Sequence, residues 1–165
     1  MMYGPVPWSQ RGRPRFPPQQ APVRQLNWFV QQTLPGTAVA HSYHVDAMRR
    51  PELSSDPAFQ RFHEIELHEL HHQIAAMGAL QRLQMGDRRA LEGLGYNLSR
   101  FAARRQSAMQ TARQLSAAVQ NDPNVQAMMN LVRQSNRMIR QYWPYIAQAI
   151  AAAGMGTVPE PRLDG

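Results

Sequence analysis

The ten residues 63–72, HEIELHELHH, include four histidines and three glutamates. Both residue types bind metals and transfer protons. Within this decamer His68, Glu69 and His72 form a literal HExxH. In zinc peptidases two histidines one helical turn apart hold the ion, and the glutamate next to the first activates water. Such a site needs a third ligand, for which Glu92 lies 20 residues beyond His72. A zinc site is therefore the first hypothesis.

Helical periodicity argues against a zinc peptidase. At about 100° per residue, the apolar residues of this segment share one arc, whereas His68 and His71 fall on the opposite side. Glu66 also places a charge shortly before the motif, and Glu92 lies outside the apolar arc of its own segment. The histidines should therefore face solvent or the edge of the packed face. The arc consists of Phe59, Phe62, Leu70, Ile74, Met77 and Leu80.

A di-iron centre is the second metal hypothesis, because Glu69 and His72 have the Glu-x-x-His spacing of di-iron bundles and Glu66 lies one turn earlier. Such bundles take carboxylates from four helices. The segment from Asn124 to Ile150 contains no acid, so one chain cannot complete the site. Two copies could combine their Glu66, Glu69 and His72 side chains.

A purely structural use of the decamer needs no missing ligand. Glu66 and Glu69 would pair with an arginine of the next helix, such as Arg100 or Arg104, while His63 and His71 stay half exposed. Burying a carboxylate without a partner costs several kcal/mol, so Glu66 must be paired, protonated or ligated. We favour this interpretation, and we predict no catalytic residue, no bound cofactor and no metal site.

Proline, aspartate and glycine divide the chain into three long helices, at about 57–85, 88–120 and 123–152. Asp56-Pro57 and Asp122-Pro123 each place a capping acceptor before proline at the first helical position. Gly86-Asp87 ends one helix and begins the next, and Gly154 ends the last. Pro144 should kink the third helix near Trp143 or end it there.

The apolar spacing of these helices predicts an all-α protein, an antiparallel up-down-up bundle of three long helices, either ferritin-like or a half-bundle. A fourth helix would fill the groove that three leave, so self-association is expected. In the second helix the apolar positions are Leu91, Leu94, Leu98, Phe101, Met109, Ala112 and Val119, and in the third they are Met128, Leu131, Met138, Tyr142, Tyr145 and Ile146.

The bundle is predicted to span residues 55–153, between two less regular ends. Residues 1–54 should form an arm and linker, since residues 1–24 hold six prolines and four arginines. Within it, residues 25–34 could form a short helix that Pro35-Gly36 stops, before a linker. Residues 154–165 are expected to be a flexible tail.

All 18 basic residues are arginine, and the formal net charge is +7. There is no cysteine for a disulfide or thiolate site, and no apolar run reaches the roughly 18 residues that span a bilayer. Because no stacking aromatics are interleaved with the arginines, we expect them to serve the bundle itself; an arginine-rich module for nucleic acid or another anionic polymer is the alternative. Its residues would be Arg11, Arg13, Arg15, Arg88, Arg89, Arg100, Arg104, Arg105 and Arg113.

The stretch from His63 to Gln84 resembles the spore coat protein F-like family, whose helical domain opens with a comparable His-Glu helix. The matching residues are His63, Glu64, Glu66, Leu67, His68 and Glu69. The resemblance implies a ferritin-like bundle that serves as structural coat material. We therefore expect a non-enzymatic assembly protein that self-associates through its helices in a spore coat or another particle assembled inside the cell, with its proline-rich ends contacting neighbours.

Overall fold

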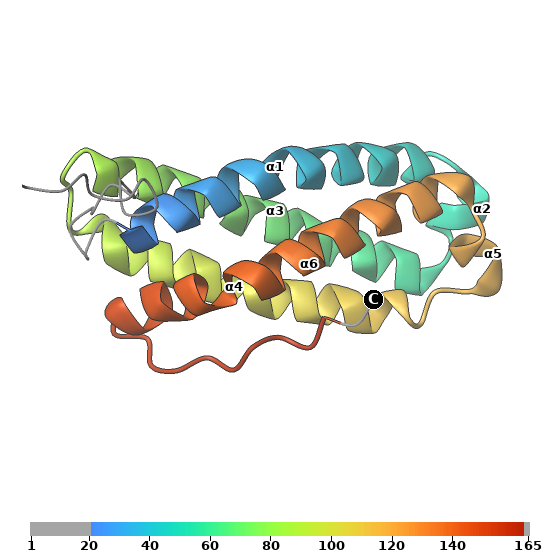
Figure 1. The fold of residues 1–165 in the computed structure, drawn as a ribbon. Helices are drawn as coiled ribbons and strands as arrows, with labels where there is room; N and C mark the ends of the chain where they lie inside the picture. The colour runs from blue at the N-terminus through green and yellow to red at the C-terminus, as the bar shows by residue number, and fades with distance from the viewer. Residues whose placement is uncertain (1–20, 164–165) are drawn as a thin grey trace, which may run out of the picture.

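The computed structural model describes residues 21–163, which form four long helices and two single-turn helices but no strand (Figure 1). None of the helices in this range is long and apolar enough to cross a bilayer. The all-α prediction is confirmed. The helices are α1 (Ala21–Met48), α2 (Pro51–Ser54), α3 (Pro57–Gln84), α4 (Ala90–Ala112), α5 (Ala117–Gln120) and α6 (Pro123–Ala152).

The four long helices pack in a ring, in which α1 and α4 each contact both α3 and α6. Figure 1 shows that the chain reverses direction from each long helix to the next, so neighbours in the ring are antiparallel. The short helices α2 and α5 lie together at one end of the bundle. The predicted three-helix bundle therefore needs correcting, because α1 fills the fourth position within the same chain.

The helices meet along buried positions that alternate by three and four residues, the spacing of coiled-coil seams. On α3 this buried line includes the polar residues Glu66, Glu69 and Gln73, and on α4 it includes Arg105. Polar residues thus occupy core positions in the middle of the bundle. The α3 line is Phe59, Phe62, Glu66, Glu69, Gln73, Ala76 and Leu80, and the α4 line is Leu94, Leu98, Phe101, Arg105, Ala108 and Ala112.

The predicted helix starts and stops are confirmed for α3 and α6. Asp56 Oδ1 accepts hydrogen bonds from the backbone N–H groups of Ala58 at 2.8 Å and Phe59 at 3.3 Å. Asp122 caps α6 in the same way. Gly86 and Gly154 follow the two helices with φ of 91° and 75°, a conformation that glycine adopts without strain.

Helix α1 differs most from the prediction. It runs through Pro35-Gly36, whereas a short helix over 25–34 and a linker were expected. Proline removes the hydrogen bond to the carbonyl four residues earlier, which belongs to Gln31, and both Pro35 and Gln31 are exposed, so water can solvate that carbonyl. Burial of Thr33, Thr37 and the later residues on the inner face of α1 stabilises the helix and offsets the loss of this hydrogen bond.

Helix α4 ends at Ala112, eight residues before the expected end. Leu115 is buried in the following turn, and Ser116 caps the short helix α5 through Val119 N at 3.4 Å. The Ser116 N–H also donates to Asp56 Oδ2 at 3.3 Å, which ties this turn to the start of α3. At Pro144 the third predicted helix does not end, since α6 continues to Ala152.

The C-terminal segment packs against the bundle, in contrast to the flexible tail that was predicted. After α6 the chain turns at Gly154 and Gly156 and runs back along the bundle (Figure 1). Pro161 and Leu163 are buried, and Arg140 Nη1 donates to the Leu163 carbonyl at 3.1 Å. We call residues 156–163 the tail. The proline-rich arm, residues 1–20, lies outside the described residues.

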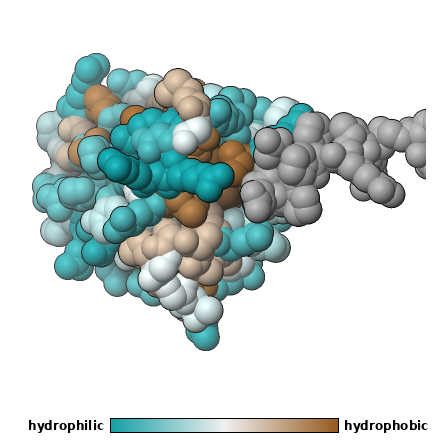
Figure 2. Space-filling view, turned by 90° about the vertical axis from the view of Figure 1, so that its left-hand side faces the viewer, coloured by the Kyte–Doolittle hydropathy of each residue, from teal (hydrophilic) through white to brown (hydrophobic). Residues whose placement is uncertain are grey.

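Figure 2 views the end of the bundle opposite α2 and α5. Most of its surface is hydrophilic, with a small apolar area near the centre. The turn between α3 and α4, which contains the exposed Met85, belongs to this end. This end of the bundle is therefore mainly hydrophilic.

Candidate functional site

Two of the three acidic residues of the decamer, Glu66 and Glu69, lie inside the bundle, in a polar layer to which all four long helices contribute. Its members come from three turns of α3 and from the facing positions of the other helices. All are buried, so this layer is an interior structure rather than an open site. The polar layer consists of Thr33, Thr37, His44, Glu66, Glu69, Gln73, Arg105, Ser135 and Asn136.

Arg105 is the centre of this layer. Its Nε donates to Glu69 Oε1 at 2.7 Å, and its Nη2 contacts the same oxygen. On α6 its other donors reach Asn136 Oδ1 at 3.1 Å and Ser135 Oγ at 3.1 Å, so the guanidinium fork joins three helices. Burial raises the pKa of Glu69 to about 7, although the Arg105 charge favours its carboxylate form.

Glu66 pairs with His44 of α1, which is fully buried. The His44 ring stacks on Phe59 and Phe62, with centroids 4.6 and 5.3 Å away. Half-buried His63 lies beside it, with ring centroids 4.6 Å apart. Burial, followed by the neighbouring histidines, lowers the pKa of His63. This part of the layer therefore favours neutral imidazole at His63.

A third part of the layer joins α3 to α1 through a hydrogen bond between two side chains. The Gln73 amide donates to the Thr33 hydroxyl, which in turn donates to the Phe29 carbonyl at 2.9 Å. Polar side chains at core positions are satisfied in only one register of the helices, which is the best-attested use of such groups. The layer therefore fixes how α1, α3, α4 and α6 align.

The HExxH residues do not converge. Glu69 points into the core toward Arg105, whereas His68 is exposed. His72 is half buried, and its Nδ1 lies 3.0 Å from Asn97 Oδ1 on α4. Among residues 21–163 no group of three histidine, aspartate or glutamate side chains is placed to hold a metal ion. Glu92 is exposed on α4 and does not join the motif.

The two-copy di-iron arrangement also conflicts with this geometry. It needs Glu66, Glu69 and His72 on a surface that two bundles share. Instead, both carboxylates are directed into one bundle, where Glu66 contacts His44 and Glu69 contacts Arg105. The prediction that Glu66 and Glu69 pair with an arginine of the next helix is confirmed for Glu69, whose partner is Arg105 rather than Arg100 or Arg104. It is wrong for Glu66, which contacts His44 of α1.

The other arginines of the nucleic-acid alternative are spread along the bundle. Arg105 is 2% exposed and cannot contact a polymer. The Arg100 guanidinium lies 5.4 Å from the centroid of the Tyr96 ring, and Arg50, outside that set, is bound to Asp122 at 2.7 Å. Arg11, Arg13 and Arg15 are outside the described residues.

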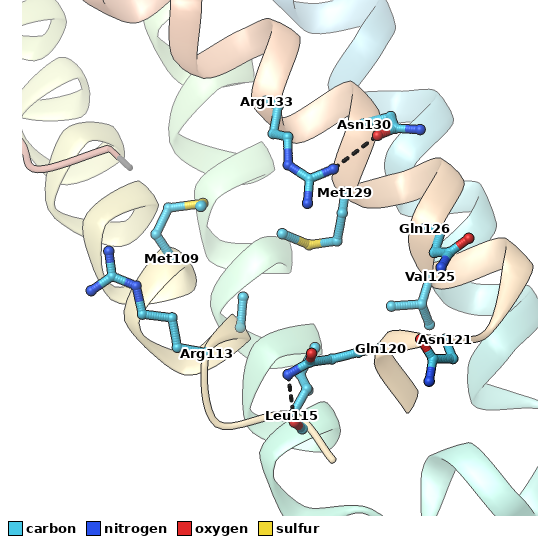
Figure 3. Close-up of a pocket in the computed structure, with 11 residues that line it drawn as sticks. Met109, Arg113, Leu115, Gln120, Asn121, Val125, Gln126, Met129, Asn130 and Arg133 are labelled. Carbon is cyan, nitrogen blue, oxygen red and sulfur yellow. Dashed lines mark hydrogen bonds between the residues drawn. The ribbon is translucent and has the colours of Figure 1, made fainter. Parts of the chain in front are cut away.

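A cavity of about 760 Å³ lies between α4 and α6, next to α5 (Figure 3). Met109 and Met129 face each other across it, and the Arg133 guanidinium extends over it from α6. Neither the His/Glu spacing nor the apolar arcs indicated this cavity, because it arises where α4 ends early. Its lining is Met109, Ala112, Arg113, Leu115, Gln120, Asn121, Val125, Gln126, Met129, Asn130 and Arg133.

The chemistry available is therefore of two kinds: a sealed ionic layer that aligns helices, and an open amphipathic cavity with arginine at its rim. The first suits a structural role and the second suits binding. No family model matches this chain, and neither does a curated protein or a solved structure, so its assignment rests on this geometry.

Proposed function

We propose that this protein is a non-enzymatic structural component that self-associates through its helices. The residues best suited to catalysis support this proposal by their position. Glu66, Glu69 and His44 form ion pairs within the core, where a substrate cannot reach them. Their role is to align the helices of a rigid unit.

The observation that carries the assembly role is an apolar stripe on the outer side of α3. Leu67 is 41% exposed and Ile74 is 53% exposed, and partly buried Leu70 lies between them. Residues seven apart lie about two helical turns apart on one face. The sequence placed Leu70 and Ile74 on the apolar arc of this helix, yet α1 and α4 leave them uncovered. A second copy of the chain would cover the stripe.

The resemblance to spore coat protein F-like proteins adds a location to this proposal, namely a coat or a comparable particle assembled inside the cell. In that setting the bundle would be a repeating unit. The measurement is fractionation of purified particles followed by mass spectrometry. Recovery of the protein only in the dispersed cytosolic fraction would contradict the location but not the self-association.

The test of self-association is the double variant Leu67→Gln/Ile74→Gln. We expect the wild type to sediment as an oligomer in analytical ultracentrifugation and the variant to dissociate at a concentration at least tenfold higher, about 1.4 kcal/mol of association free energy. The matched control is Arg61→Gln/His68→Gln, which changes two exposed residues seven apart on the same helix. A monomeric wild type at every concentration, or equal dissociation of both variants, would refute the proposal.

A further inference from the structure

An extended segment of the chain already packs on the outside of the bundle. The tail runs back along the bundle, with Val158 and Leu163 packed against the core residues of the long helices (Figure 1). Arg140 of α6 donates to the Leu163 carbonyl at the end of this segment. The tail thus shows how this bundle binds an extended chain: apolar side chains pack against the core, and an arginine of α6 holds a carbonyl oxygen.

The 760 Å³ cavity has the same construction. Arg133 precedes Arg140 by seven residues, so both lie on the same face of α6, about 10.5 Å apart along its axis. About three residues of extended chain cover that distance. Figure 3 shows the last described part of the tail ending on the Met109 side of the cavity. The cavity therefore lies further along α6 than the contact between Arg140 and Leu163.

The lining of the cavity defines what would bind there. Buried Ala112, Leu115 and Val125 provide an apolar floor, and the methionines beside them can adapt to different side chains. The rim carries Arg113, Arg133 and four side-chain amides, and no acid is found among the described lining residues. This rim is complementary to carboxylate and carbonyl oxygens.

The openness and the charge of this cavity indicate which class of ligand fits it. The cavity is partly open to solvent, whereas sites for small molecules usually enclose most of the ligand. An extended peptide, which can stay exposed on one side, fits such a cavity better. The chain's own arm is a poor candidate, because residues 1–20 contain three arginines and no acid. Like charge on the rim would oppose its binding.

We propose that this cavity is a docking site for an extended acidic peptide segment of a partner protein. An apolar side chain of the peptide lies between Met109 and Met129, and a carboxylate or carbonyl binds Arg133. This site is separate from the apolar stripe of α3 and does not depend on self-association.

The experiment measures binding of fluorescein-labelled peptides by anisotropy, with the full chain. The acidic probe is Ac-VPEPLVEPEL-NH2, and its charge-reversed form has lysine at each glutamate. We expect the acidic probe to bind, Arg133→Glu to weaken it at least tenfold, and added salt to weaken it further. The matched control is Arg137→Glu, the same charge change at an exposed residue of α6 outside the cavity lining, which should leave binding unchanged.

Three outcomes would overturn the proposal: no binding of the acidic probe, equal binding of both probes, or equal weakening by the two variants. Preferential binding of a peptide copying residues 1–20 would assign the cavity to the arm of another copy instead. Circular dichroism must show unchanged helicity for both variants. Repeating the titration with Leu67→Gln/Ile74→Gln separates the two proposals, since docking should persist in a chain that no longer self-associates.

Discussion

At the scale of single residues, the pair formed by Glu69 and Arg105 is the contact on which the polar layer depends. Replacing one member leaves an uncompensated buried charge, which costs about 3–5 kcal/mol. We expect Glu69→Ala to lower the free energy of unfolding by that amount in urea denaturation. The cause is the stranded Arg105 guanidinium, whose Nε and Nη2 lose their acceptor.

The control for this prediction is the double variant Glu69→Leu/Arg105→Met, which removes both charges and keeps apolar volume. Replacing a buried ion pair in this way is often neutral or stabilising. The double variant should therefore recover most of the stability that Glu69→Ala loses. If the double variant were less stable than Glu69→Ala, the ion pair would contribute net stability and this account of the layer would be wrong.

His63 makes the stability depend on pH. Burial and the neighbouring His44 and His41 hold its pKa below the ordinary 6.5, while Glu64 and Glu66 act in the opposite direction. The folded protein thus binds this proton less readily than the unfolded chain. Stability that is present above about pH 6.5 is therefore lost as the pH falls below it. We expect His63→Gln to flatten that decrease, measured by urea denaturation between about pH 7 and pH 5.

The Glu69 carboxyl changes the free energy of unfolding with pH in the opposite direction, so its contribution must be separated from that of His63. Its pKa is raised from 4.5 to about 7, so its contribution to stability is complete below pH 4.5 and is lost as the pH rises toward 7. Both proteins contain Glu69, so its contribution cancels when the free energy of unfolding of His63→Gln is subtracted from that of the wild type at each pH. A difference that stays constant across the pH range would show that His63 does not titrate differently on folding.

At the scale of elements, two glycines of the bundle have opposite requirements. A Cβ added at Gly78 in α3 would meet nothing within 4 Å. A Cβ at Gly95 in α4 would overlap the Cβ of Ala153 and lie 3.2 Å from the Ala149 carbonyl oxygen, because α4 and the end of α6 approach closely there. Alanine favours helix over glycine by about 1 kcal/mol.

Gly78→Ala should therefore raise the free energy of unfolding by about 0.5–1 kcal/mol, whereas Gly95→Ala should lower it by about 1–3 kcal/mol through overpacking. Thermal unfolding followed by circular dichroism measures both changes. The two variants add the same methyl group to a helix interior, so each is the control for the other. Equal effects would show that α4 and α6 do not touch at Gly95.

The sequence predicted those elements whose boundaries are local. Asp-Pro caps and glycine stops placed α3 and α6 within one residue of their observed bounds. Helix α1 was missed because Pro35 is a local helix breaker, and only the packing of Thr33, Thr37 and the residues after them shows that the helix continues. Tertiary contacts outweighed local propensity there.

The polar layer could have been found by a different criterion. Arg105 continues the spacing of Leu98 and Phe101, and Glu66 and Glu69 continue that of Phe59 and Phe62. A search limited to apolar residues passes over charged residues at core positions. The same search assigned Ile74 to the core, whereas its side chain is 53% exposed in the structure. The pairing of Glu66 with His44 depended on α1, so it could not be predicted once that segment was assigned to a linker.

At the scale of the whole molecule, the tail packs against the core that the long helices form. Leu163 is 3% exposed at the last described position, and burying a leucine contributes about 1.5–3 kcal/mol. The tail should therefore be held to the bundle in most molecules. Trypsin can report this, because Arg162 lies between the buried residues Pro161 and Leu163.

Leu163→Gln should release the tail and accelerate tryptic cleavage after Arg162 at least tenfold, the change that 1.4 kcal/mol produces in an opening equilibrium. Mass spectrometry of timed samples identifies the cleaved bond. Met155→Gln is the control, because Met155 is 40% exposed in the turn before the tail and its replacement should not change the rate. Cleavage of the wild type as fast as Leu163→Gln would mean that the tail is not held against the bundle, and the binding mode inferred from the tail would then have no observed example.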